Sequence, residues 1–239
     1  PGVNAAMRKT LYTLLINGYS PRITKLTLPM IRFYAHKIGA DFHIITERKF
    51  PEWPITYEKM QVHELAQRHG NEWNIFMDAD TLVHPHTPDF TAYLPRDTVA
   101  HNGSDFANVR WRYDKYFMRD GRNIAGGNWL AIASDWCIDL WKPLDIGPDE
   151  AMANIFPIVE ELRGGCLRDH LVDDYATSRN IARYGLKFKG VLQIQKEMGI
   201  EGVGGFFHLY NVPESEKIEK IMQELDKWKI PAEIRQYGE

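Results

Sequence analysis

The sequence predicts an α/β protein in which helices flank a doubly wound, mostly parallel sheet within a single domain. Three observations lead to this prediction. Over residues 9–82, apolar runs that suit strands alternate with amphipathic runs that suit helices, the joins are short, and a glycine follows each helical run. Because a strand–helix–strand unit returns the chain in the same direction, its two strands pair in parallel.

The first half, about residues 9–82, is expected to form a β-α-β-α-β unit, from which doubly wound nucleotide-binding folds are built. Its predicted elements are a strand over 9–17, a helix over 21–37, a strand over 41–46, a helix over 56–68 and a strand over 73–77. The sequence contains neither G-x-G-x-x-G after the first strand nor G-x-x-x-x-G-K-S/T. This argues against a dinucleotide enzyme and a P-loop NTPase.

The second half, about residues 83–210, is less regular, and a helical tail follows over 211–239. The predicted elements are strands over 98–101 and 186–189, a loop entering a strand over 124–133, and helices over 134–141, 148–163, 167–180 and 213–228. The polar and aromatic stretch 105–122 is open between a lid, an acceptor-binding loop and a packed helix.

Two carboxylates follow the apolar run 73–77, where a buried strand should end. Asp78 and Asp80 lie two residues apart, so both could reach one cation if the turn curls around it. Ligands of open α/β sheets sit beyond the carboxyl ends of the strands, and carboxylates suit Mg²⁺ or Mn²⁺. The sequence therefore predicts a metal held against substrate phosphates, with an ordinary solvated turn as the alternative.

A second acidic group lies on the predicted helix over 167–180. His170, Asp173 and Asp174 are spaced i, i+3 and i+4 and share one face of that helix. The alternative is a solvated acidic face with an incidental histidine. Farther along, His208 stands alone in an apolar, glycine-rich stretch, and a lone histidine of this kind is more often a structural residue than a ligand.

Composition excludes several classes of function. The net charge of −3 offers no basic footprint for nucleic acid, so no nucleic-acid partner is expected. No run approaches 18 apolar residues, so no transmembrane segment is expected, and there is no signal-peptide pattern. We expect a cytoplasmic protein, with a membrane-peripheral location or membership of a longer polypeptide as alternatives.

The order of these motifs resembles that of the GT-A-fold, Rossmann-like glycosyltransferases, and most closely that of glycogenin-like and galactosyl- or xylosyltransferase-like families. Four features carry the resemblance: residues 57–60 with the Asp-x-Asp at 78–80, the glycine loop 126–128, the acidic pair Asp173-Asp174 on a later helix, and the late histidine in Phe207-His208-Leu209. The resemblance also assigns the acceptor and catalytic groups to residues 83–210. The resemblance implies a nucleoside-diphosphate sugar as donor, a saccharide or other hydroxyl-bearing acceptor, and Mn²⁺ or Mg²⁺ as cofactor.

The resemblance also implies roles for individual residues. Asp80 would be the principal metal ligand, Asp78 would reach the metal or the ribose, and His208 would be the third ligand. Asn17 and Tyr19 would bind the base and ribose, and Lys59, Arg112 and Lys115 would bind the nucleotide or its phosphates. Gly127 and Asn128 would lie beside the donor sugar, and Asp173 and Asp174 would lie near the anomeric carbon. For Lys59 the alternative is an exposed helix lysine.

Stereochemistry is open at this stage, and so are two other functions. An inverting enzyme would use Asp174 or Asp173 as the base, and a retaining enzyme would place Asn128 or Asp174 beside the donor sugar. A phosphatase of the haloacid dehalogenase type places Asp-x-Asp-x-Thr/Val after an apolar strand, which residues 78–82 resemble superficially, with Asp78 as the nucleophile. Such enzymes, however, carry the motif on their first strand. The other alternative is a non-catalytic protein that binds a nucleotide or sugar.

Overall fold

The structure is a computed structural model that describes residues 7–102, 128–161, 171–200, 205–209 and 212–238. Its strands are β1 (Lys9–Leu14), β2 (Asp41–Ile45), β3 (Trp73–Met77), β4 (Leu82–Val83), β5 (Thr98–His101), β6 (Leu130–Ser134), β7 (Lys187–Gly190) and β8 (Phe206–Phe207). The α-helices are α1 (Pro21–Lys37), α2 (Gln61–His69), α4 (Pro148–Glu161), α5 (Val172–Arg183), α6 (Val191–Glu197), α7 (Glu214–Lys227) and α8 (Ala232–Arg235), and the 3₁₀ helices are η1 (Ile16–Gly18), η2 (Ile55–Met60), η3 (Phe90–Ala92) and η4 (Asp135–Trp141).

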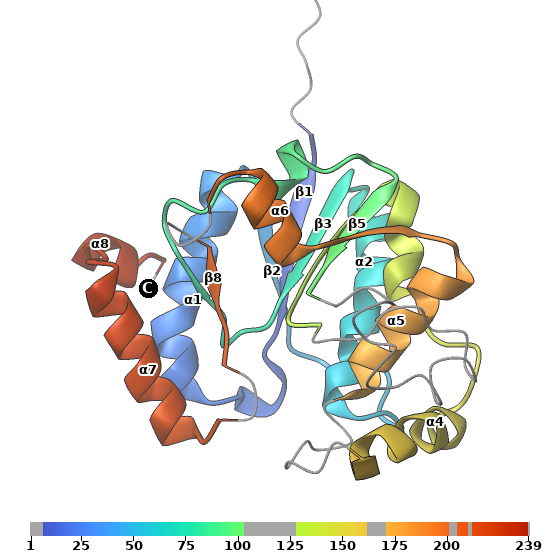
Figure 1. Ribbon diagram of the computed structural model, residues 1–239. Coiled ribbons are helices and arrows are strands. Elements are labelled where there is room, and N and C mark those ends of the chain that lie inside the picture. Colours follow the sequence, from blue (N-terminus) through green and yellow to red (C-terminus); the bar gives the residue numbers. More distant parts are fainter. Residues whose placement is uncertain (1–6, 103–127, 162–170, 201–204, 210–211, 239) are drawn as a thin grey trace, which may run out of the picture.

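The central sheet has six strands in the order β2-β1-β3-β6-β5-β7, so it combines strands from both predicted halves (Figure 1). β1 pairs in parallel with β2 and β3, and β5 pairs in parallel with β7. β6 runs antiparallel to both of its neighbours, β3 and β5. The predicted α/β class with a mostly parallel sheet is therefore confirmed, and the reversed β6 begins at the edge where β1 and β3 end.

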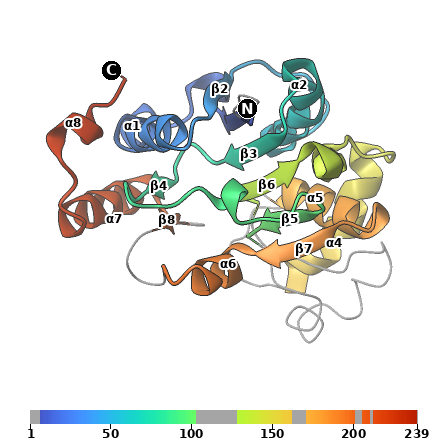
Figure 2. The ribbon, with the colours of Figure 1, turned by 90° about the horizontal axis from the view of Figure 1, so that it is seen from above.

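Helices cover both faces of this sheet because its strands bury side chains in both directions. Successive residues of β1 and β3 alternate between two cores: Tyr12 and Phe76 pack toward α2, η4 and α5, whereas Leu11 and Ile75 pack toward α1 and α6. Figure 2 shows the two groups of helices, with α2, α4 and α5 on one side and α1, α6 and α7 on the other. This three-layer arrangement leaves the strand ends as the place for a site.

The helix α7, near the end of the chain, lies beside α1 in both ribbon views (Figures 1 and 2). A third apolar core joins them, formed by Ile23, Met30, Leu82, Ile221, Leu225 and Ile230. The same region contains a second small sheet, in which β4 pairs antiparallel with β8. No helix in the described ranges is both long and apolar enough to span a lipid bilayer.

Several predicted boundaries agree with the structure, and others are wrong for identifiable reasons. The predictions for α1, β3 and β5 match their observed bounds. The predicted strand over 9–17 ends early, at Leu14, because Asn17 and Gly18 adopt positive φ angles of 56° and 66°, which break an extended chain. The helix predicted over 134–141 is the 3₁₀ helix η4, and neither β4 nor α6 was predicted.

Candidate metal centre and active site

The Asp-x-Asp motif forms a tight turn immediately after β3. The Thr81 amide donates to the Asp78 carbonyl at 3.0 Å, which closes the turn, and the Asp78 amide donates to the Trp129 carbonyl at 2.8 Å. The Thr27 hydroxyl of α1 donates to the Ala79 carbonyl. The turn is thus held from both sides, by α1 and by the start of β6.

His208 reaches this turn because of the register between β4 and β8. Leu82 pairs with Phe207, so His208, the residue that follows β8, lies beside the residues that precede β4. The His208 Nε2 atom lies 3.3 Å from Asp80 Oδ1 and 3.8 Å from Asp78 Oδ2. The imidazole ring also stacks on Trp129, with a centroid distance of 5.1 Å and an interplanar angle of 7°. The contacts with Asp80 and Trp129 therefore orient a residue that lies more than a hundred positions from the motif.

Asp78, Asp80 and His208 each offer one ligand atom, and these three atoms lie within 4.8 Å of one another. Two carboxylate oxygens and one imidazole nitrogen form a donor set that suits Mn²⁺ and can accept Mg²⁺. The sequence-based expectation that His208 would lie beside the Asp pair is confirmed. Asp80 is only 6% exposed, so the alternative of a solvated turn is wrong for this residue.

Lys59, near the end of η2, lies between Asp78 of this cluster and Asp173 of α5. Its Nζ atom is 2.8 Å from Asp78 Oδ1, donates to Asp173 Oδ2 at 2.6 Å and donates to the Asn128 carbonyl at 2.8 Å. The residue is 3% exposed, so the alternative of an exposed helix lysine is wrong. Burial alone would lower the pKa of Lys59, but the charges of Asp173 and Asp78 outweigh burial and raise the pKa above its ordinary value. These ion pairs connect the turn after β3 to the start of α5, and a contact with the nucleotide stays a prediction.

The neighbouring Glu58 is fully buried, and its carboxylate contacts the loop that follows β2. Its carboxylate accepts hydrogen bonds from Arg48 Nε, from the Lys49 and Phe50 amides and from the Gln61 side chain. It therefore fixes the loop that follows β2. Sequence reasoning did not single out Glu58, because an isolated glutamate in a polar helical stretch gives no signal of burial.

The first turn of α5 places Asp173 beside Lys59 and Asp174 beside Asn128. Asp174 Oδ1 accepts a hydrogen bond from the Asn128 amide, and Asp173 pairs with Lys59. Burial raises the pKa of Asp173, with Lys59 opposing the change; burial also raises the pKa of Asp174, and the charge of Asp173 raises it further. Asp173 is 2% exposed, so a solvated acidic face is the wrong description of it.

Some buried polar atoms beside Lys59 have no partner among the described residues. They are both side-chain heteroatoms of Asn128 and the Oδ1 atom of Asp173. Asn128 is 2% exposed. An unpaired buried polar group costs about 1–3 kcal/mol, and such groups in native proteins commonly bind a ligand or water. Their position next to Asp174 marks where hydroxyl groups of a ligand could bind.

The second carboxylate oxygen of Asp80 is bound by two further residues. Lys217 Nζ lies 2.6 Å from Asp80 Oδ2, and the Tyr19 hydroxyl donates to the same oxygen at 2.9 Å. Burial alone would raise the pKa of Asp80, but the neighbouring His208 and Lys217 hold it well below its usual range. Tyr19 was predicted as a nucleotide contact, whereas Lys217 was missed.

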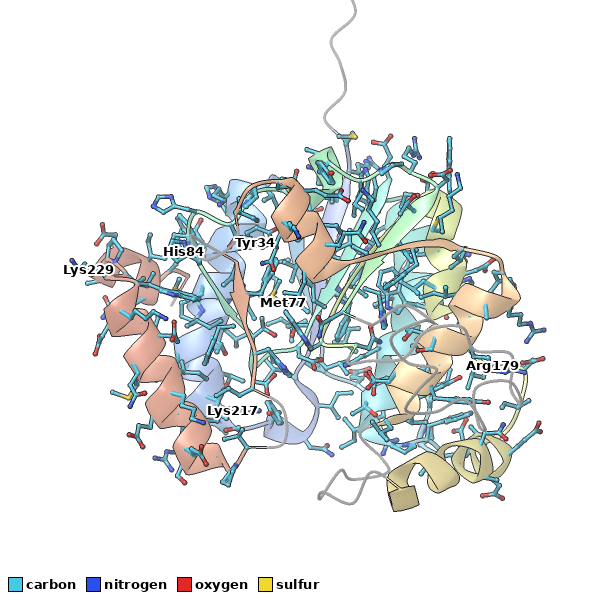
Figure 3. All side chains as sticks on the ribbon, in the orientation of Figure 1. Tyr34, Met77, His84, Arg179, Lys217 and Lys229 are labelled. Atoms are coloured by element: carbon cyan, nitrogen blue, oxygen red, sulfur yellow. The ribbon has the colours of Figure 1, made fainter. Side chains whose placement is uncertain are left out.

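The periodicity of the sequence over α7 indicates that Lys217 faces inward. Ile221 and Leu225 form the inner stripe of α7, and Lys217 continues that stripe one turn earlier. A lysine at an inward-facing position needs a partner, but the periodicity does not say which acid it meets. Lys217 lies on the side of α7 that faces α1 and the sheet (Figure 3).

The remaining predicted positions divide into two groups. Asn17 and Tyr19 are exposed and follow β1, at the edge of the sheet that also carries the Asp pair. Arg112, Lys115, Gly127 and His170 lie outside the described residues. A role for any of these residues in binding the nucleotide or donor sugar stays a prediction.

Comparison with known proteins adds only a likeness of fold. No protein-family model and no curated protein matches the chain. Among solved structures, it is similar to the crystal structure of a glycosyltransferase involved in the glycosylation of the major capsid of PBCV-1. The match has a TM-score of 0.49 and 11% sequence identity, and it covers 90% of this chain and 99% of that chain. At these values the likeness supports no conclusion about activity, which must be argued from the side chains.

Proposed function

We propose that this protein is a metal-dependent glycosyltransferase that moves a sugar from a nucleoside-diphosphate sugar to an acceptor hydroxyl. The observation that carries the proposal is the placement of Asp78, Asp80 and His208 around one point beyond β3, directly beside the Lys59–Asp173–Asp174 network. A cation centre adjacent to buried carboxylates suits a reaction that expels a diphosphate and activates a hydroxyl.

Asp78, Asp80 and His208 would hold the cation, which is Mn²⁺ or Mg²⁺ by the chemistry of the donors. When bound, a divalent ion supplies positive charge that stabilises the negative charge developing on a departing diphosphate. Trp129 supports this arrangement, since it stacks on the imidazole and accepts the hydrogen bond from the Asp78 amide.

Asp174 and Asn128 are the proposed groups at the sugar. A carboxylate with a raised pKa is suited to take a proton from an acceptor hydroxyl, as an inverting transfer requires, and Asp174 meets that condition. The side-chain amide of Asn128, which has no partner among the described residues, would hydrogen-bond the donor sugar, and in a retaining transfer it would lie beside the reacting centre. The anomeric configuration of the first product, read by NMR, distinguishes the two.

The test begins with binding of a nucleoside diphosphate panel in the presence of Mn²⁺ or Mg²⁺. Hydrolysis and transfer of the matching nucleotide sugars are measured next. Asp80→Ala should abolish divalent-dependent binding and turnover while the protein stays folded. The matched control is Asp135→Ala, because Asp135 is an aspartate that follows the other end of β6 and pairs with Arg96.

Two outcomes would overturn the proposal. Full metal-dependent activity in Asp80→Ala would show that Asp80 is not a ligand of the metal. Metal-dependent nucleotide binding without any turnover would favour a binding protein. A phosphatase of the haloacid dehalogenase type is disfavoured, because Asp78 follows the third strand of the chain and Asp173 and Asp174 lie on a helix. Hydrolysis of a generic aryl phosphate would restore that alternative.

A further inference from the structure

Each carboxylate of the centre has one oxygen bound by a buried lysine and the other directed at His208. Asp78 uses Oδ1 for Lys59 and presents Oδ2 to the imidazole, whereas Asp80 uses Oδ2 for Lys217 and presents Oδ1. The two ammonium groups come from η2 and α7, which lie far apart in the sequence. Each aspartate therefore uses one oxygen for a lysine and the other for His208, and the two lysines come from different elements of the fold.

This arrangement fixes the charge of the centre as well as its geometry. Lys217 is 8% exposed and Asp80 is 6% exposed, so water screens their interaction only weakly. The ammonium of Lys217 offsets the negative charge of Asp80 and repels any cation placed on the opposite oxygen. A divalent ion at the three ligand atoms would thus add positive charge beside an Asp80 whose own charge Lys217 already balances, and beside an Asp78 that shares Lys59 with Asp173. A diphosphate, which carries several negative charges, would remove that excess.

We propose that Lys217 is a positioning residue that turns Asp80 Oδ1 toward His208 and offsets the Asp80 charge, so that a divalent cation binds tightly only together with a diphosphate. The inference rests on the proposed function, because it assumes that the cation and a diphosphate share this centre. It adds the prediction that binding of the two is coupled and assigns the coupling to a residue outside the ligand set. Coupling of this kind is reciprocal, so the cation should strengthen diphosphate binding by the same factor.

The neighbouring Tyr19 allows charge to be separated from hydrogen bonding. Its hydroxyl donates to the same oxygen of Asp80 as Lys217 does, but it carries no charge. Lys217→Gln and Lys217→Met remove the charge, Lys217→Arg retains it, and Tyr19→Phe removes only a neutral donor. Lys220→Met is the matched control, because Lys220 lies on the same helix and pairs with Glu216 at the surface.

The experiment measures the dissociation constant of Mn²⁺ by the electron paramagnetic resonance signal of the free ion, on variants shown to be folded by thermal melting. Lys217→Gln and Lys217→Met should tighten Mn²⁺ binding to the ligand-free protein about tenfold or more. Lys217→Arg, Tyr19→Phe and Lys220→Met should each stay within about threefold of the wild type, well short of a tenfold step. Calorimetry with inorganic pyrophosphate, corrected for the Mn²⁺–pyrophosphate complex in solution, should show a smaller coupling factor in the two neutral variants.

The result that overturns the inference is unchanged or weaker Mn²⁺ binding in Lys217→Gln and Lys217→Met. Weaker binding that Lys217→Arg restores would mean that Lys217 only orients Asp80. Equal coupling in the wild type and in the neutral variants would also refute it. Pyrophosphate contains neither base nor sugar, so these measurements do not depend on finding a donor. A protein without transferase activity that shows the coupling would refute the proposed function and leave the role of Lys217 standing.

Discussion

Replacing Lys59 with methionine tests whether this lysine holds the two halves of the site together. The substitution keeps an apolar stem of similar length and removes one ammonium group from two carboxylates and a backbone carbonyl. Among the described residues, Asp173 would then be a buried charge with no cation beside it, while Asp78, whose side chain is 26% exposed, would regain part of its hydration. The loss should therefore come mainly from Asp173.

Removing one partner of a buried ion pair costs about 3–5 kcal/mol, because the other charge stays buried and unpaired. For a domain of this size each kcal/mol lowers the melting temperature by about 2–4 °C, so Lys59→Met should lower it by about 6–20 °C. The double variant with Asp173→Asn should recover much of the loss, since replacing both members removes the uncompensated charge.

The assay is thermal and urea unfolding of the wild type, the two single variants and the double variant at pH 7. Lys49→Met is the control: Lys49 is half-exposed and pairs with Glu64 at the surface, so the change should cost about 1 kcal/mol or less. A melting temperature for Lys59→Met within about 2 °C of the wild type, less than a single kcal/mol, would refute the reasoning. So would additive losses in the double variant, because additivity would mean that the two residues do not interact.

Three further predictions follow from the same region. Asp174→Asn should slow sugar transfer at least about a hundredfold while changing donor affinity little, as steady-state kinetics and equilibrium binding would measure; equal losses in both would make Asp174 structural. Burial and the nearby Lys59 charge lower the pKa of His101 to about 3, so below about pH 6.5 the unfolded state binds a proton that the native state does not. Stability should thus fall by up to about 1.4 kcal/mol per pH unit from this histidine as the pH drops from about 6.5 toward 3, and His101→Gln should remove that slope in urea titrations. Glu58→Gln should destabilise the protein by about 1–3 kcal/mol in the same titrations, because several buried donors lose a charged acceptor; an unchanged urea midpoint would contradict this.

Local patterns predicted the first half of the fold well. The helix α1 and the strand β3 have their predicted bounds, because one is a long amphipathic run and the other a strongly apolar run. The strands β4 and β8 have two residues each, too few for a periodicity to be recognised, and they exist only because they pair with each other. The 3₁₀ geometry of η4 was likewise invisible, since a short apolar run predicts a helix without specifying its type.

The amino-acid sequence alone determined the parallel β-α-β-α-β half and the place of Asp78 and Asp80 at a strand end, because these follow from runs and spacings along the chain. The roles expected for His208 and Asp174 came from the resemblance to a known family. Only the tertiary structure decided which oxygen of each aspartate faces His208 and which faces a lysine. That division depends on the pairing of β4 with β8 and on the packing of α7 against α1, both of which join segments more than a hundred residues apart. Contacts over such distances depend on how whole faces of helices and strands fit together, so no local pattern encodes them.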